Sequence, residues 1–209
     1  MSHGVHAVQH EVDHRIEHEG AHGDAAILQQ SLNKRIALLI GVLALCLALA
    51  ETMAKSAQTS ALSYNIESAN LWSFFQAKNI RRTTMLTAAD DLSLRAKVAS
   101  DPAMRGEMTK LVEKWRSTAA RYQSEPSNGE GTKELAARAK KAHKKYDTAM
   151  ARYHHYEVAS AAFQIAIVLA SATVITGLLA LTWVAIGLGG LGLIFTLIGL
   201  FAPHAVHLF

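Results

Sequence analysis

Two long apolar segments divide the sequence and set its predicted architecture. Residues 36–50 carry no charged side chain, and the same holds for every position of 158–209. One helical crossing of a bilayer takes about 20 residues, so the first segment, extended to 35–54, supplies one span. The second segment is long enough for two spans, which we place at 158–178 and 183–201 with a tight turn between them. The sequence therefore predicts an all-α protein with three transmembrane helices.

The polar segment between the first two spans is also predicted to be helical. Asp101 followed by Pro102 is typical of a helix start, with an N-cap residue and a proline at the first helical position. The stretch SEPSNGEG at 124–131 is the clearest loop signal, and Thr132 is expected to cap the helix after it. The predicted helices are 55–100, 102–123 and 132–157.

The third of these helices carries the most regular hydrophobic repeat in the chain. Its small and apolar residues follow one another at alternating steps of four and three, the spacing of a coiled-coil seam. No helix breaker interrupts 52–100 or 133–178, so we expect two long helices that pair antiparallel as a stalk. The helix 102–123 is expected to close its tip. The seam consists of Leu135, Ala139, Ala142, Tyr146, Ala149, Tyr153 and Tyr156.

Residues 1–34 are predicted to form an amphipathic helix. Its histidines are spaced four residues apart, so they stack as a stripe on one face. Two such imidazoles can chelate Zn²⁺, Ni²⁺ or Cu²⁺, but zinc takes four ligands, so another helix or chain would supply the rest. The alternatives are a solvated polar face and a pH-sensitive contact. A neighbouring apolar stripe, Val8, Val12 and Ile16, indicates that the helix lies against a sister chain or the membrane surface. The histidines are His6, His10, His14, His18 and His22.

One acidic residue, Glu51, lies at the edge of the first predicted span. A carboxylate at the border of the hydrocarbon is costly and marks a candidate polar site. Lys55, one helical turn later, is its expected ion-pair partner. In a ring of subunits, Glu51 would instead form a carboxylate ring at a pore mouth.

Small residues recur along the last predicted span. Ala185 with Gly189, and Gly192 with Thr196, form small-xxx-small pairs that favour close helix packing, on the second span or on another subunit. Residues 187–192 also match the letters of a dinucleotide-binding loop, but no strand precedes them and no acidic residue follows at the required distance. Helix packing is therefore the predicted role.

Charge and cysteine content add limits to this picture. The formal net charge is +4 with a pI of about 9.2, and the excess is concentrated in 138–152, just before the second span. Such a stretch favours anionic lipid headgroups, and without a reading module it does not predict nucleic-acid binding. Basic residues flanking a span tend to lie on the cytoplasmic side. The basic stretch before the second span therefore predicts a cytoplasmic stalk, whereas Lys34 and Arg35 before the first span predict a cytoplasmic N-terminus and a stalk on the other side, so orientation stays open. Cys46 is the only cysteine, which excludes an internal disulfide.

Two stretches carry a family resemblance. Residues 70–81, NLWSFFQAKNIR, fit the signature W-x-[YF]-[YF]-Q-A-K-x-[IL]-[KR], and 163–171, FQIAIVLAS, resemble the start of a second span in the same group. The chain thus resembles a bacterial family of uncharacterised membrane proteins. That resemblance implies a His-rich N-terminal helix, one span, a helical soluble region and a closing transmembrane hairpin in the inner membrane. The motif residues are Trp72, Phe74, Phe75, Gln76 and Lys78.

No set of nucleophile, base and orienting group and no phosphate-binding loop is evident, so the sequence predicts that the protein is not an enzyme. The first hypothesis is a homo-oligomeric structural or scaffolding assembly of the inner membrane. The second is an ion-conducting, channel-like assembly with Glu51 at the pore and the histidine helix as metal or pH sensor. The third is an accessory subunit of a larger membrane complex. The tail 202–209 carries no further signal.

Overall fold

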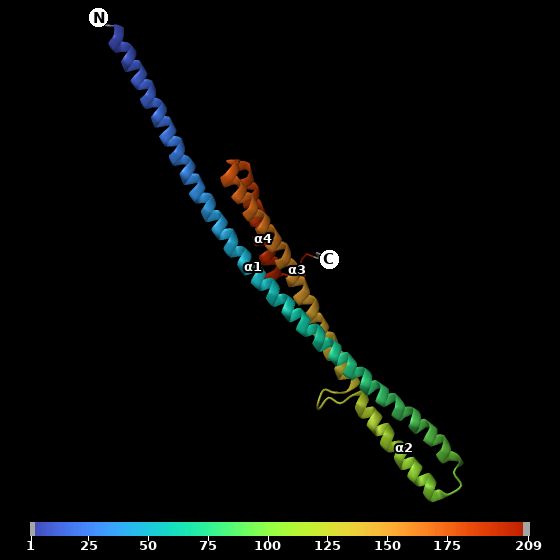
Figure 1. The fold of residues 1–209 in the computed structure, drawn as a ribbon. Coiled ribbons are helices and arrows are strands. Elements are labelled where there is room, and N and C mark those ends of the chain that lie inside the picture. Colours follow the sequence, from blue (N-terminus) through green and yellow to red (C-terminus); the bar gives the residue numbers. More distant parts are fainter. Residues whose placement is uncertain (1–2, 207–209) are drawn as a thin grey trace. The chain divides into compact units, whose positions relative to one another are not determined.

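The computed structural model describes the backbone of residues 3–206 and the side chains of residues 30–206. It contains four helices, α1 (His3–Val98), α2 (Pro102–Gln123), α3 (Thr132–Thr176) and α4 (Leu179–Phe201) (Figure 1). Over residues 3–206 there is no strand. The predicted all-α class is confirmed, and α1, α3 and α4 are long and apolar enough to cross a membrane.

The chain divides into two compact units. Unit 1 combines the chain up to Ala54 with the chain from His154 onward, and unit 2 is Lys55–Tyr153. Helices α1 and α3 contribute to both units without a break in either helix. The apolar segments of α1, α3 and α4 that are long enough to span a bilayer lie in unit 1, and unit 2 consists of α2 and the polar segments of α1 and α3 between Lys55 and Tyr153.

In unit 1, α3 and α4 form an antiparallel hairpin with a very short turn. Gly177 has a φ of 69°, a left-handed conformation that glycine adopts without steric cost, and its N–H donates to the carbonyl of Thr173 at 2.8 Å. Because this glycine ends α3 abruptly, α4 already starts at Leu179. The last span was expected to begin only at 183, after a longer turn, and this boundary is wrong because residues 179–182 already belong to α4.

Three glycines of α4 lie where the helix meets its neighbours in the same chain. A Cβ built on Gly189 would stand 2.7 Å from Leu43 Cδ2 of α1. On Gly192 it would stand 2.9 Å from the ring of Phe163, and on Gly199 2.8 Å from the ring of Tyr156. Ala185 is fully buried on the same side, and Thr196 donates its hydroxyl to the carbonyl of Gly192 at 2.8 Å. The small residues of α4 therefore contact α1 and α3.

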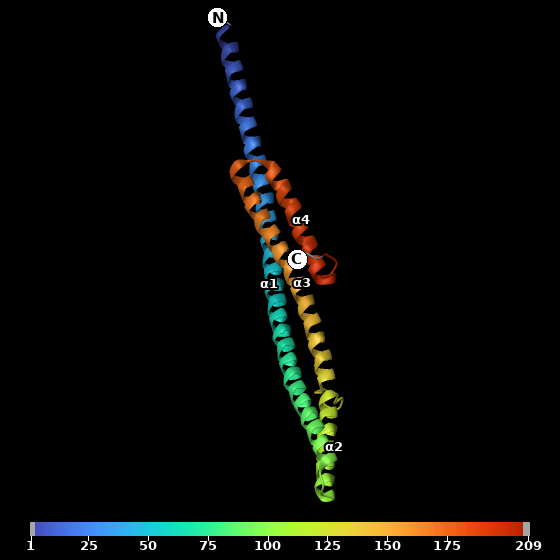
Figure 2. The same ribbon diagram turned by 90° about the vertical axis from the view of Figure 1, so that its right-hand side faces the viewer.

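In unit 2, α1 and α3 run antiparallel around a small core (Figures 1 and 2). Leu71 of α1 packs with Leu135, Ala139 and Ala142 of α3. The hydroxyl of Ser68 donates to the carbonyl of Ala139 across this contact at 3.2 Å. The small α3 residues allow the two backbones to approach closely.

The starts of α2 and α3 differ in how they are capped. Asp101 Oδ1 accepts from the N–H of Ala103 at 2.9 Å and Pro102 is the first helical residue, as predicted. Thr132, expected as the cap of α3, is instead its first residue, and its hydroxyl donates to the carbonyl of Gln123 at 3.2 Å. The expectation for Thr132 is wrong because its side chain joins the end of α2 to the start of α3.

The glycine contacts of α4 yield a stability prediction. Gly192→Val and Gly199→Val place methyl groups into the rings of Phe163 and Tyr156, and overpacking of this kind costs about 1–3 kcal/mol. Gly190→Val is the matched control, because a Cβ there meets nothing within 4 Å. Thermal unfolding in detergent, followed by circular dichroism, should show lower midpoints for the first two variants only. Equal midpoints for all three variants would contradict the packing.

Candidate functional site

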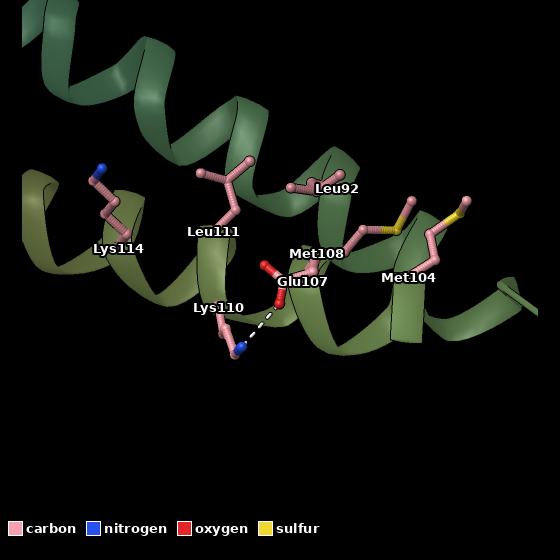
Figure 3. A pocket seen from close by; sticks show the side chains of 7 residues that line it. All are labelled: Leu92, Met104, Glu107, Met108, Lys110, Leu111 and Lys114. Carbon is pink, nitrogen blue, oxygen red and sulfur yellow. Dashed lines mark hydrogen bonds and ion pairs between the residues drawn. The ribbon is translucent and has the colours of Figure 1, made fainter. Parts of the chain in front are cut away.

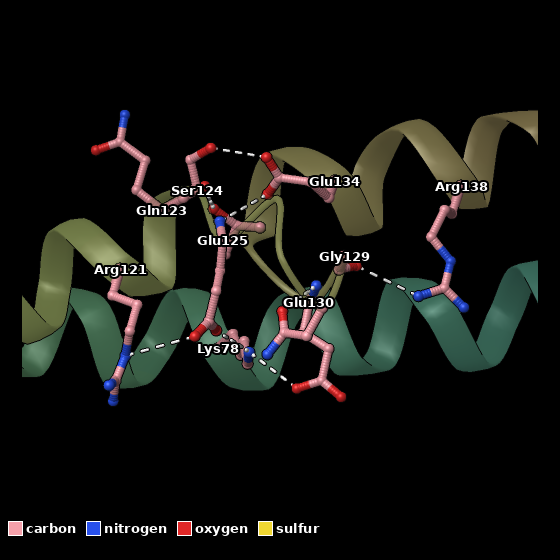
Figure 4. Close-up of polar contacts among 11 residues, drawn as sticks. Lys78, Arg121, Gln123, Ser124, Glu125, Gly129, Glu130, Glu134 and Arg138 are labelled. Carbon is pink, nitrogen blue, oxygen red and sulfur yellow. Dashed lines mark hydrogen bonds and ion pairs between the residues drawn. The ribbon is translucent and has the colours of Figure 1, made fainter.

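The most strongly built polar site lies in unit 2 around a buried lysine. The side chain of Lys78 is only 8% exposed, and its Nζ lies 3.3 Å from Glu130 Oε2 and 3.8 Å from Glu125 Oε2 (Figure 4). The same Nζ lies 5.3 Å from the ring centre of Phe74 and 5.7 Å from that of Tyr122. We call Lys78, Glu125 and Glu130 the Lys78 clasp.

The clasp has a clear electrostatic basis. A buried ammonium is costly unless charged or polar groups surround it, and aromatic faces add a further attraction for a cation. Glu125 and Glu130 both belong to the loop between α2 and α3, whereas Lys78 belongs to α1. The clasp therefore fastens this loop to α1.

Further polar contacts order the same loop (Figure 4). Glu134 of α3 accepts a hydrogen bond from the hydroxyl of Ser124 at 2.7 Å and another from the N–H of Glu125 at 3.2 Å. Arg138 donates to the carbonyl of Gly129 at 3.3 Å. Both ends of the loop and its middle are thus tied to neighbouring helices.

The hydrogen bond from Ser124 lowers the pKa of the Glu134 carboxyl below its ordinary value of 4.5. The backbone N–H groups of Glu134 itself and of Glu125, and the charge of Lys133, act in the same direction, and burial opposes them. A carboxylate in the first turn of a helix is also favoured by the helix dipole. The charged form of Glu134 is therefore the form that holds the loop.

The motif residues separate into three environments. Trp72 and Phe75 pack on the core of unit 2 with their rings 5.3 Å apart and nearly perpendicular. Phe74 faces the ammonium of Lys78. Gln76 is exposed. The motif thus contributes to the core, to the clasp and to an outer face of α1.

The predicted seam lies on the inner side of α3. Its buried members are Leu135, Ala139, Ala142, Ala149 and Tyr156, while Tyr146 and Tyr153 are partly buried. Lys78 follows the buried Leu71 by one heptad on α1, so the spacing alone could have identified it as a charged residue in a seam. Its acidic partners carried no such signal, because they come from a loop.

Glu51 has different partners from those expected. Its Oε1 accepts from Gln164 Nε2 at 3.1 Å and from the hydroxyl of Ser160 at 3.5 Å, both on α3. These two donors take the place expected for Lys55, and that expectation is wrong. Glu51 and Gln164 are exposed and Ser160 is buried, so these bonds join α1 and α3 at the edge of their contact.

A histidine without a sequence signal is the most buried titratable group in the described part of the chain. His155 is 1% exposed, and its Nε2 lies 3.0 Å from the carbonyl oxygen of Pro203. Because a carbonyl only accepts, Nε2 carries the proton, and Nδ1 has no hydrogen-bond partner. The ring also stacks on Phe195 at 6.1 Å. His155 therefore attaches the segment after α4 to α3.

The N-terminal histidines cannot be placed as a site. His6, His10, His14, His18 and His22 belong to the backbone of α1, but their side chains lie outside the described residues. Among residues 30–206 no group of three or more His, Cys, Asp or Glu side chains could hold a metal ion. Metal binding by the stripe stays a prediction.

An open groove of about 440 Å³ lies between the end of α1 and the start of α2 (Figure 3). Glu107 and Lys110 at its edge form an ion pair of 2.8 Å. Leucine and methionine side chains line it, which suits an apolar side chain rather than a polar ligand. The lining residues are Leu92, Met104, Glu107, Met108, Lys110, Leu111 and Lys114.

A family model described as "Domain of unknown function (DUF4337)" matches residues 32–202 of the chain. No curated protein and no solved structure matches the chain. The family match covers all four helices from within α1 to the end of α4, and the histidine stripe precedes it.

Loss of the cation from the clasp should destabilise unit 2. Lys78→Met keeps the aliphatic stem but leaves Glu130 without its cation and leaves Glu125 with Arg121 alone, at 3.7 Å, at a cost of about 1–3 kcal/mol. Arg95→Met is the control, because it breaks an exposed pair with Asp91 that is worth at most about 1 kcal/mol. Urea unfolding in detergent measures both. An equal loss of stability in the two variants would show that the clasp contributes no more to the free energy of unfolding than an exposed ion pair does.

The bond between Ser124 and Glu134 should make stability depend on pH. Because the pKa of Glu134 is lowered in the folded state, its contribution is complete above 4.5 and is lost as the pH falls through the folded pKa. Ser124→Ala should raise that pKa, so its deficit in stability relative to wild type should be present at neutral pH and shrink in acid. Urea unfolding at neutral and at acidic pH measures the stability deficit of the variant, with Ser117→Ala as the control. A deficit that persists in acid would assign the effect to another cause.

Proposed function

The chain belongs to the DUF4337 family, a family of unknown function, and we propose that it is a structural scaffold that works as a homo-oligomer in the bacterial inner membrane. The observation that supports this role most directly is the continuity of α1 and α3. Each helix contains an apolar segment long enough to span a bilayer and a polar segment of unit 2, with no break between them. A polar helical unit built on membrane helices is suited to presenting surfaces rather than to enclosing a substrate.

The polar contacts of unit 2 also fit a structural role. The Lys78 clasp, the bond between Ser68 and the carbonyl of Ala139, and the bonds of Glu134 all join one helix or loop to another. Their chemistry fixes the arrangement of helices. The basic stretch 138–152 then faces anionic headgroups or acidic partners.

Self-association in this proposal uses surfaces other than the alanine seam and the glycines of α4. Those small residues contact α1, α3 and α4 of the same chain, so they are not left over for a second subunit. The histidine helix offers one further contact, a Zn²⁺, Ni²⁺ or Cu²⁺ ion bound between subunits, since one stripe supplies too few ligands for a closed zinc site.

The second candidate is an ion-conducting assembly with Glu51 at the pore mouth and the histidine helix as metal or pH sensor. The Glu51 carboxylate, however, bonds to Gln164 and Ser160 of its own chain. A carboxylate bonded within its own chain favours a role inside the subunit over a role at the symmetry axis of a pore. The third candidate, an accessory subunit of a larger complex, predicts a monomer when the protein is isolated.

Native mass spectrometry of the protein released from nanodiscs, with and without a chelator, tests the proposal. A single defined stoichiometry above one supports the scaffold, and its loss on chelation would make the histidine helix a metal-dependent clasp. The variant with His6, His10, His14, His18 and His22 changed to Ala is the control for the chelator. A clean monomer, indifferent to the chelator, would overturn both oligomeric candidates.

A further inference from the structure

The loop between α2 and α3 contains a chemically reactive pair, Asn128 followed by Gly129. The backbone nitrogen after an asparagine can attack the carbon of its side-chain amide, and glycine permits this best because it has no Cβ to obstruct the approach. The four other asparagines of the chain all lie in α1 and precede a lysine, a leucine or an isoleucine. Asn128 is exposed and Gly129 is partly exposed. The pair is therefore the one place in the sequence where an asparagine is followed by a glycine, and water reaches it.

Two hydrogen bonds hold the reacting groups of this pair. The N–H of Gly129, whose nitrogen is the nucleophile, donates to the carbonyl of Glu125 at 3.0 Å. The side-chain Oδ1 of Asn128, bonded to the carbon that is attacked, accepts from the N–H of Glu130 at 2.9 Å. The attack requires the amide proton of Gly129 to leave, so the bond to Glu125 has to break first. The closed loop therefore slows the reaction.

The two residues that supply these bonds are also the acids of the Lys78 clasp. Glu125 and Glu130 bind Lys78 Nζ through their carboxylates, at 3.8 and 3.3 Å (Figure 4), while their backbones hold the reactive pair. Loss of the clasp loosens both reacting groups at once. A group that is protected by local structure reacts in proportion to the population of the locally open state. The strength of the clasp should thus set the reaction rate.

We propose that Asn128 is a site of spontaneous deamidation whose rate is controlled by the Lys78 clasp. In the open loop the nitrogen of Gly129 loses its proton and bonds to Cγ of Asn128. The bond from Cγ to Nδ2 breaks, and the nitrogen takes up that proton and leaves as ammonia. Water then opens the cyclic imide at either of its carbonyls and yields aspartate or isoaspartate. Water is the only co-reactant, and no electrons are transferred.

The product acts back on the clasp. Either product adds a carboxylate between Glu125 and Glu130, and isoaspartate also adds one carbon atom to the main chain of the loop. The loop then no longer has the length that brings both acids to Lys78. Modified chains should hold the clasp more weakly, and the change is one-way. This inference concerns unit 2 of a single chain and does not depend on the proposed oligomer.

Mass spectrometry of the tryptic peptide 122–133 measures the reaction, after timed incubation of the full-length protein in nanodiscs at neutral pH. Lys78→Met should deamidate about ten times faster than wild type, because losing a hydrogen bond to a charged group shifts an opening equilibrium by about this factor. Arg95→Met, which breaks an exposed pair, should match wild type. Both substitutions lie outside the measured peptide, so they leave its own reactivity unchanged.

A synthetic peptide with the sequence of 122–133 gives the rate without the fold, and it should react at least about ten times faster than the folded wild type. Arg138→Gln tests the loop on its own, because it removes only the exposed hydrogen bond to the carbonyl of Gly129, and it should also raise the rate. Helical circular dichroism verifies that Lys78→Met is folded, and Arg138→Gln decides if it is not.

Three results would overturn the inference. Equal rates for the synthetic peptide and the folded wild type would show that the fold does not protect Asn128. A wild-type rate in folded Lys78→Met, or in Arg138→Gln where Lys78→Met does not fold, would show that the clasp does not control the reaction. Deamidation of the α1 asparagines as fast as that of Asn128 would show that the pair with Gly129 has no special reactivity.

Discussion

Close contact between two helices with small residues at their interface is the constraint on which the rest of this structure depends. On α1 the buried residues Ile36, Leu43, Ala50 and Ala57 follow one another at intervals of seven. On α3 the buried alanines include Ala139, Ala142, Ala159 and Ala166. In lipid no hydrophobic force drives helices together, so packing of small residues carries the association. In water the same residues add the gain from burying apolar surface. One type of seam therefore serves both units.

A seam of alanines holds helices close but specifies their register weakly, because one small residue fits much like the next. The Lys78 clasp supplies the missing specificity. A charged residue at a seam position is tolerated only where its partners lie, and a polar residue in a coiled-coil core is known to select register at some cost in stability. Glu125 and Glu130 meet Lys78 only when α1 and the loop stand in one alignment. The same alignment places Leu71 against Leu135.

The elements with a period could be predicted from the sequence, and the contacts without one could not. The helices, the α3 seam and the Asp101 cap follow from spacing and local chemistry. The spacing of Lys78, one heptad after Leu71, marks it as a charged residue in a seam, but its partners could not be predicted, because the acids that bind it come from a loop whose path depends on tertiary contacts. Lys55 was chosen as the partner of Glu51 by a rule for one helix, whereas Gln164 and Ser160 reach it from another. His155 belongs to no periodic pattern, and its burial depends on how the chain returns after α4.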